Sequence, residues 1–248
     1  MAILKSKNLI KSYDHRIVVN KVNLEIHSGE IIGLLGRNGA GKTTTFQMIV
    51  GLIKPDKGEI YLDTKDISRD STHARAKVGI TYLPQENSVF LKTSVANNLQ
   101  MVWELIGNKK KKRMDLPQQL LEELGLKKLT QQKAYSLSGG ERRKLEICRA
   151  LLLNPKFLLL DEPFTGIDPL TIIDLQKILI KLRSRGIGVV LSDHNVRDTF
   201  RITDRAYIID KGKILVEGNP QEVASNKLAR EHFLGENFNL GEEVSYSS

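Results

Sequence analysis

The sequence contains a single cysteine and no long hydrophobic run. Cys148 therefore has no partner for an internal disulfide, and its place in an apolar helical pattern predicts a small buried residue in a reducing cytosol. No apolar stretch approaches the roughly 18 residues that a membrane-crossing helix requires. Residues 1–10 carry Lys5 and Lys7 but lack the apolar core of a secretory signal, so we expect none.

Acidic residues are in deficit. The chain of 248 residues holds 38 Lys and Arg against 29 Asp and Glu, a net charge of +9, which favours an anionic partner such as a nucleotide, a nucleic acid or a membrane surface. The densest basic cluster is Lys109-Lys110-Lys111-Lys112-Arg113. No aromatic residues interleave with these charges for stacking on bases, so a solvated loop is favoured over a nucleic-acid patch.

A glycine-rich segment stands between an apolar run and a helical pattern. It reads Gly36-Arg37-Asn38-Gly39-Ala40-Gly41-Lys42-Thr43, after Ile31-Ile32-Gly33-Leu34-Leu35 and before a predicted helix at residues 44–50. Strand, glycine loop and helix together are the context of a phosphate-binding loop. The glycines let backbone N–H groups approach anionic oxygens, and the helix N-terminus adds partial positive charge. Lys42 is predicted to reach the β- and γ-phosphates, and the Thr43 hydroxyl to ligate Mg²⁺.

Periodicity outlines the elements around this loop. Residues 1–27 are predicted to form paired strands, residues 58–62 another, and Val78, Ile80 and Tyr82 alternate in a strand before Gln85. Helical spacing from about residue 88 to residue 135 predicts a helical insertion in an α/β core. Residues 207–216 are predicted to form a hairpin, and residues 220–234 a helix. The phosphate loop has no second copy, so the chain carries one nucleotide-binding unit.

Two adjacent carboxylates end a strongly apolar run. Asp161 and Glu162 follow Phe157-Leu158-Leu159-Leu160, a pattern typical of a central parallel strand. Ligands of open α/β sheets bind at this end of the strands, where such a pair commonly serves a metal and a water. A helix cap is the less favoured interpretation, because Asp168-Pro169 already supplies the next cap and first helical residue.

Four other polar residues have simple structural interpretations. Ser138 and Glu141 have the spacing of a capping box, which by itself would explain them. His194 follows a predicted buried strand at residues 188–193 and, taken alone, is more simply a loop histidine. Tyr13 lies at the turn between the first two strands, where a surface tyrosine is the simpler interpretation.

In order and spacing, these motifs resemble those of the ATP-binding-cassette (ABC) ATPases over residues 1 to about 240. The motifs are the phosphate loop, Gln85, Leu137-Ser138-Gly139-Gly140-Glu141, Leu160-Asp161-Glu162-Pro163 and Ser192-Asp193-His194. The resemblance implies an α/β fold, a P-loop NTPase ABC cassette with a RecA-like mixed sheet core, an antiparallel β subdomain and an α-helical subdomain. It further implies one domain over residues 1–240, a helical subdomain at about residues 88–153, and a flexible tail at 241–248.

The family implies a role for each motif. The expected catalytic residues are Glu162, His194, Gln85 and Lys42. The expected ATP-binding residues are Tyr13, Gly36, Arg37, Asn38, Gly39, Ala40, Gly41, Lys42, Thr43, Thr44, Ser138, Gly139, Gly140 and Glu141. The expected Mg²⁺ ligands are Thr43, Gln85 and Asp161. Residues 138–141 would contact ATP bound to a second copy of the chain, in a head-to-tail dimer around two ATP molecules with Asp168 at its seam.

Closer resemblance within the family is to the ATPase subunits of lipopolysaccharide export transporters. It is carried by His73-Ala74-Arg75-Ala76, Tyr82-Leu83-Pro84-Gln85-Glu86, Ser192-Asp193-His194-Asn195-Val196-Arg197 and Leu234-Gly235-Glu236-Asn237-Phe238. It implies a motor on the cytoplasmic face of the inner membrane, with integral membrane subunits docking near Gln85–Phe90, no nucleic-acid partner and no direct membrane insertion. The ATPase subunits of branched-chain amino-acid importers are the alternative.

Two other function classes are disfavoured. ABC ATPases that act on nucleic acids usually carry a long coiled coil or two cassettes, and neither is found in this sequence. Intact Glu162 and His194 argue against a nucleotide sensor that does not hydrolyse ATP.

Overall fold

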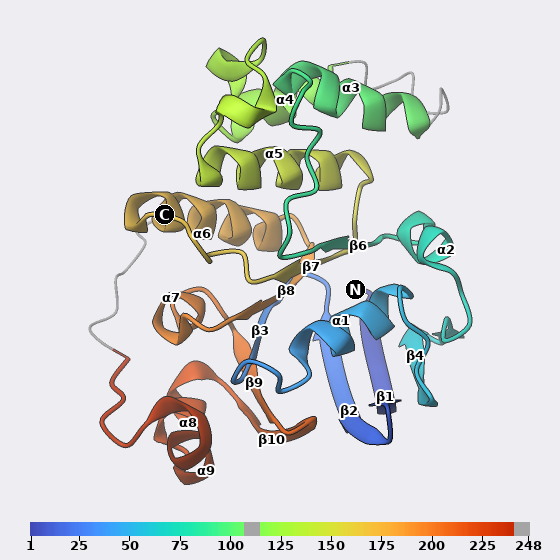
Figure 1. Cartoon of the computed structure of the whole chain (residues 1–248), viewed down its shortest axis with the longest axis vertical. Coiled ribbons are helices and arrows are strands. Elements are labelled where there is room, and N and C mark those ends of the chain that lie inside the picture. The colour runs from blue at the N-terminus through green and yellow to red at the C-terminus, as the bar shows by residue number, and fades with distance from the viewer. Residues whose placement is uncertain (107–114, 241–248) are drawn as a thin grey trace.

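The computed structural model describes residues 1–106 and 115–240 and contains two β-sheets (Figure 1). The basic run at 109–113 and the predicted tail at 241–248 lie outside the described residues. The larger sheet has six strands in the order β10-β9-β3-β8-β7-β6, and the smaller has four in the order β2-β1-β4-β5. The strands of the larger sheet are β3 (Ile31–Leu35), β6 (Ile80–Leu83), β7 (Phe157–Asp161), β8 (Gly188–Asp193), β9 (Arg205–Asp210) and β10 (Lys213–Gly218). Those of the smaller are β1 (Ile3–Tyr13), β2 (Arg16–His27), β4 (Lys57–Leu62) and β5 (Lys65–Asp66).

Five neighbouring strands of the larger sheet run parallel, from β9 through β3, β8 and β7 to β6. The C-terminal ends of β3, β6, β7 and β8 therefore meet at one edge of the sheet. Strand β10 is antiparallel to β9, to which the predicted hairpin joins it. Its turn residues Lys211 and Gly212 have φ of 46° and 76°, the backbone that a tight right-twisted hairpin requires.

Helices cover both faces of the larger sheet. They are α1 (Lys42–Val50), α2 (Thr72–Lys77), α3 (Val95–Leu105), α4 (Leu116–Glu123), α5 (Gly139–Leu152), α6 (Pro169–Ser184), α7 (Val196–Phe200), α8 (Pro220–Ser225) and α9 (Lys227–Ala229), with short turns η2 (Lys127–Leu129), η3 (Ala134–Ser136) and η4 (Arg230–Leu234). In Figure 1, α3, α4 and α5 lie together at the top beside α6, whereas α1 lies near the smaller sheet. Within residues 1–106 and 115–240, no helix has the length and apolar character needed to cross a membrane.

Strand β7 contributes side chains to both hydrophobic clusters, one on each face of the larger sheet. Leu158 and Leu160 belong to the hydrophobic cluster under the helices α3 to α6, and Phe157 and Leu159 belong to the cluster under α1 and the smaller sheet. All residues of β7 are buried. This is the double-sided burial predicted from its apolar run, and it leaves only the strand end open for polar chemistry.

Helix α5 confirms two predictions. Ser138 caps it, accepting from the Glu141 backbone N–H at 3.2 Å, while the Glu141 carboxylate accepts from the Ser138 N–H at 2.8 Å. Its predicted apolar stripe is buried, including Cys148. Burial raises the pKa of the Cys148 thiol, so this cysteine is an unreactive core residue.

Two element boundaries were predicted incorrectly. Strand β6 begins at Ile80, because Val78 ends the short helix α2, which has too few residues for a periodic signal. The predicted helix at 220–234 is broken at Asn226, which is extended with ψ of 127°. The Asn226 side chain accepts from the N–H groups of Leu228 and Ala229, so it starts a new turn rather than continuing the old one.

Candidate functional site

The glycine-rich loop joins β3 to α1 at the carboxyl edge of the larger sheet. Gly41 has φ of 107°, and a Cβ there would lie 2.8 Å from the Val18 carbonyl oxygen. A Cβ at Gly36 would lie 2.2 Å from the Ile209 carbonyl oxygen. Glycine is therefore required at both positions. The first turn of α1 has neither an acidic residue nor a side-chain cap, which leaves its N–H groups for an anion.

A cavity of about 300 Å³ opens over this loop. Its lining residues are Val18, Asn38, Gly39, Gly41, Lys42, Thr43, Thr44, Gln85 and Glu162. Gln85 and Glu162 follow β6 and β7, so the parallel sheet brings two distant polar groups to the phosphate loop. Gly36, Arg37 and Ala40, also expected to bind nucleotide, belong to the same loop but are not among the lining residues.

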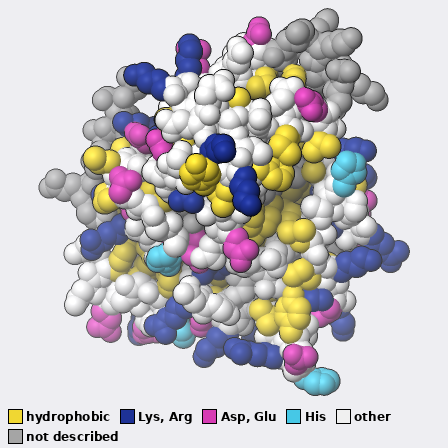
Figure 2. Space-filling view, turned by 45° about the horizontal axis from the view of Figure 1, so that its top comes forward, with side chains coloured by type: hydrophobic (Ala, Val, Ile, Leu, Met, Phe, Trp, Pro, Cys, Tyr) yellow, Lys and Arg dark blue, Asp and Glu magenta, His cyan; other side chains and the backbone are white. Residues whose placement is uncertain are grey.

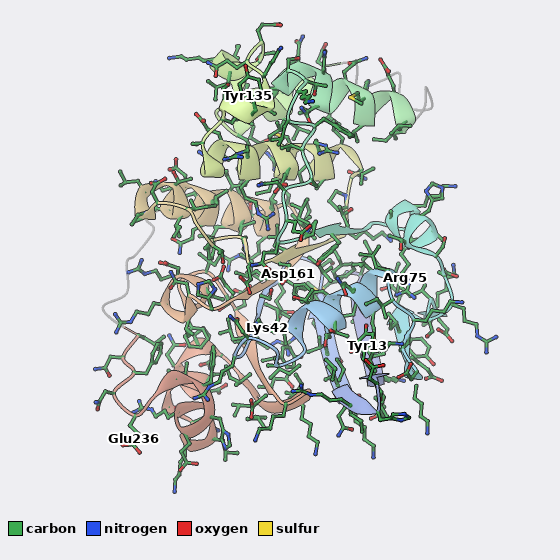
Figure 3. The ribbon with its side chains drawn as sticks, in the orientation of Figure 1. Tyr13, Lys42, Arg75, Tyr135, Asp161 and Glu236 are labelled. Atoms are coloured by element: carbon green, nitrogen blue, oxygen red, sulfur yellow. The ribbon has the colours of Figure 1, made fainter. Side chains whose placement is uncertain are left out.

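Lys42 lies at the base of the cavity. Its side chain is largely buried, and Nζ donates to the carbonyl oxygens of Gly36 at 2.7 Å and Arg37 at 3.2 Å. Burial lowers the pKa of the Lys42 ammonium, whereas the negative charges of Glu162 and Asp161 act to raise it. In Figure 3, Lys42 and Asp161 lie close together at the centre of the molecule. The ammonium and the Glu162 carboxylate therefore line the same cavity, and the charge of the buried Asp161 also acts on the ammonium.

Glu162 turns out of the sheet directly after β7. Its φ of 46° is left-handed, a conformation uncommon for a residue with a side chain and recurrent at active sites. Its carboxylate Oε2 accepts from Gln85 Nε2 at 2.9 Å and from Thr165 Oγ1 at 3.1 Å, and His194 Nδ1 lies 3.6 Å away. A carboxylate held in this way can orient a water molecule and accept its proton.

Asp161 is fully buried, and each of its two carboxylate oxygens accepts a hydrogen bond from a different neighbouring strand. Ser192 Oγ of β8 donates to Oδ1, and Tyr82 Oη of β6 donates to Oδ2 at 3.1 Å. Burial and the charge of Asp161 raise the pKa of the Tyr82 hydroxyl, so it remains a neutral donor. Neither donor is assigned this role by the sequence motifs, although a polar serine after Val189-Val190-Leu191 is a usable signal.

His194 lies at the end of β8 with its side chain about half exposed. Its Nδ1 is 3.6 Å from Asp193 Oδ1, the same distance as from Glu162. Asp193 is buried and accepts from the N–H groups of Phe164 at 3.0 Å and Asn195 at 2.9 Å, while burial raises the pKa of its carboxyl. The two hydrogen bonds to Asp193 fix the end of β8. The His194 ring, which follows directly, is thereby held beside the Glu162 carboxylate.

The candidate metal-ligand atoms near the cavity are oxygens, which suit magnesium better than a transition metal. Across residues 1–106 and 115–240 there is no group of three or more His, Cys, Asp or Glu side chains able to hold a metal ion. Thr43, Gln85 and Asp161 offer hydroxyl, amide and carboxylate oxygens, and Gln85 uses its nitrogen, not its oxygen, toward Glu162. Mg²⁺ prefers oxygen ligands and binds through few protein groups together with phosphates and water.

Five expected nucleotide-binding residues outside the phosphate loop do not line the cavity of this chain. Among the described residues that line it, none belongs to α5, so the expected contacts Ser138, Gly139, Gly140 and Glu141 lie elsewhere. Tyr13 is also outside the lining, 43% exposed at the end of β1, with the Lys11 ammonium 5.5 Å from its ring centroid. Val18 of the same hairpin does line the cavity.

Comparisons with known proteins agree with this geometry. Residues 19–165 match the family described as ABC transporter. The lipopolysaccharide export system ATP-binding protein LptB of Acidithiobacillus ferridurans is 49% identical over 238 residues, which cover 96% of this chain and 99% of that protein. LptB of Escherichia coli strain K12 is 48% identical over 241 residues, covering 97% and 100%.

Solved structures are similar over most of the chain as well. The ADP conformation of MJ1267, an ATP-binding cassette of an ABC transporter, superposes with a TM-score of 0.87 at 28% identity, covering 95% of this chain and all of that one. The dimeric post-hydrolysis structure of the cassette MJ0796 with ADP and Pi gives 0.77 at 25% identity, covering 88% and 98%. The predicted fold class is confirmed.

Proposed function

Since this chain belongs to the ABC transporter family, we propose that it is the ATP-hydrolysing subunit of a lipopolysaccharide export transporter. The observation that carries the proposal is an identity of 48% to 49% that extends over nearly the whole length of both export-system relatives. Neither of these relatives is named for amino-acid import, so we favour export over the alternative.

The proposed reaction is the transfer of the γ-phosphoryl group of ATP to water. Lys42 and the N–H groups of the loop hold the phosphates, and Glu162 accepts a proton from the attacking water. Gln85 and His194 keep the Glu162 carboxylate oriented and border the γ-phosphate. Such a step depends on positioning and charge stabilisation more than on covalent chemistry, which suits side chains already held within 4 Å of one another.

We assign Mg²⁺ binding to Thr43, Gln85 and Asp161. When bound, the ion neutralises negative charge on the phosphates. Asp161 does not line the cavity, which favours a contact through water. Its two hydrogen-bond donors leave one lone pair on each oxygen, so it retains acceptor capacity for such waters.

A second copy of the chain is proposed to complete the nucleotide site. Residues 138–141 bring the Ser138 hydroxyl and the helix N–H groups at the start of α5, yet they do not line the cavity of their own chain. The dimeric MJ0796 cassette offers a precedent for assembly. Each ATP would then lie between the phosphate loop of one copy and the start of α5 of the other, with Asp168 near the seam. In this scheme residues 1–240 form one domain, and residues 88–153 its helical subdomain.

The membrane partners are proposed to dock beside Gln85. Phe90 and Leu91 are 44% and 41% exposed, although both are large and apolar. The Arg149 guanidinium lies 4.9 Å from the centre of the Phe90 ring, which holds the ring in place at the surface. Figure 2 shows hydrophobic side chains reaching the surface among Lys and Arg on one face of the molecule. Docking there would keep the subunit on the cytoplasmic face of the inner membrane.

Purification in a mild detergent tests the proposal directly. We expect integral membrane subunits of a lipopolysaccharide exporter to copurify with the chain, and Phe90→Asp to lose them. Leu228→Asp is the matched control, because Leu228 is similarly exposed, at 48%, on α9. Copurification of amino-acid importer subunits would overturn the assigned cargo, and full retention of partners by Phe90→Asp would overturn the docking site.

A further inference from the structure

Tyr82 connects three parts of the site. It lies on β6, three residues before Gln85, and its hydroxyl donates to Asp161 Oδ2 at 3.1 Å. Its ring meets Phe46 of α1 edge to face, with centroids 6.5 Å apart and an interplanar angle of 87°. Phe46 is fully buried four residues after Lys42, so the ring is fixed by the same helix that begins at the phosphate loop.

The two donors on Asp161 come from opposite sides. Strand β7 lies between β6 and β8, and these strands contribute Tyr82 and Ser192 respectively. One donor on each oxygen opposes rotation of the carboxylate about its Cβ–Cγ bond. Without the tyrosine hydroxyl, only the Ser192 bond to Oδ1 would resist that rotation. The remaining lone pairs of Asp161 would then lose their fixed direction.

We propose that Tyr82 is a positioning residue for metal–nucleotide binding, one that orients the Asp161 carboxylate through its hydroxyl. This inference rests on the proposed role of Asp161 in binding Mg²⁺. Groups that orient metal ligands typically change metal affinity by 10–100-fold when removed. For a single hydrogen bond we expect about a tenfold effect, at the lower end of that range. The effect is confined to metal-dependent binding, because the tyrosine hydroxyl acts through its hydrogen bond to Asp161.

Tyr82→Phe removes the hydroxyl and keeps the ring against Phe46. The affinity of the full-length chain for ADP, measured by calorimetry with excess MgCl₂ and with EDTA, gives the factor by which Mg²⁺ strengthens binding. We expect this factor to fall about tenfold in Tyr82→Phe, with metal-free affinity unchanged. The MgCl₂ concentration for half-maximal ATP hydrolysis should rise by a similar factor, and turnover should recover at saturating MgCl₂.

Tyr207→Phe is the matched control. It removes another hydrogen-bonded tyrosine hydroxyl from a residue only 2% exposed, near Glu25 and away from the cavity. We expect it to leave unchanged the factor by which Mg²⁺ strengthens ADP binding, hereafter the magnesium factor. Equal weakening of ADP binding with and without Mg²⁺ in Tyr82→Phe would reveal a merely structural role and overturn the inference, as would an unchanged factor.

Asp161→Asn separates this inference from the function on which it rests. If Asp161→Asn abolishes the magnesium factor and Tyr82→Phe does not change it, the positioning role fails and the proposed Mg²⁺ ligand stands. If Asp161→Asn leaves the factor unchanged, the assignment of Asp161 fails, and the inference fails with it.

Discussion

Gly140 offers a sharp steric test of how α5 and α6 pack. A Cβ at this position would lie 2.0 Å from Thr171 Cγ2, 3.1 Å from its Cβ and 3.3 Å from its Oγ1. Thr171 is held in place, since its hydroxyl donates to Asp168 Oδ2 at 2.6 Å and its N–H to Asp168 Oδ1 at 3.0 Å. Gly140→Ala must therefore push the helices apart or break the cap of α6.

The expected cost follows from this overlap. Overpacking a filled site costs about 1–3 kcal/mol, and the higher helix propensity of alanine offsets up to about 1 kcal/mol. We therefore expect Gly140→Ala to lower the free energy of unfolding by about 1–2 kcal/mol. For a chain of this size that corresponds to a fall in Tm of about 2–8 °C. Thr171→Ser removes the clashing methyl group but keeps the hydroxyl for Asp168, so it should relieve most of the cost.

A double-mutant cycle measured by thermal and urea unfolding checks this reasoning. The parent, Gly140→Ala, Thr171→Ser and the double variant are compared under identical conditions. We expect a favourable coupling of about 1 kcal/mol between the two substitutions, so that Thr171→Ser rescues at least half of the loss. Strictly additive losses, or a Gly140→Ala protein as stable as the parent, would refute the steric account.

Three further predictions test other parts of the chain. Glu162→Gln keeps the side-chain size but removes the proton acceptor, so ATP turnover should fall by about 100-fold or more while an ATP-bound dimer accumulates in size-exclusion chromatography; near-parental turnover would exclude that role. Arg75→Lys loses a buried guanidinium that donates to four backbone carbonyl oxygens, two of them near the end of α1, and should cost about 2–4 kcal/mol in urea unfolding. Burial acts to raise the pKa of Glu123, but hydrogen bonds from Arg185 at 2.5 Å and Lys181 at 3.2 Å lower it below the usual 4.5. The resulting stabilisation is present above pH 4.5 and is lost as the pH falls through the folded-state pKa, so the stability advantage over Glu123→Gln should shrink on acidification, and an advantage that grows would contradict this.

Local patterns were sufficient for much of the site. The phosphate loop is one contiguous segment, and its chemistry depends on backbone that only glycine permits at Gly36 and Gly41. The run before Asp161 identified a buried strand, because double-sided burial needs consecutive apolar residues. The capping box at Ser138 and the hairpin turn before β10 were equally readable from neighbouring residues. Short elements such as α2 and the break at Asn226 were not, since a few residues carry no measurable period.

The sequence alone determined which groups could do chemistry; the tertiary structure decided which of them meet. Gln85 and Glu162 are 77 residues apart and join at 2.9 Å, while Tyr82 and Asp161 are 79 apart and join at 3.1 Å. Both contacts follow from the strand order β8-β7-β6, which depends on how whole layers pack rather than on any local pattern. The same packing keeps the start of α5 out of the cavity of its own chain, because it holds Gly140 against α6.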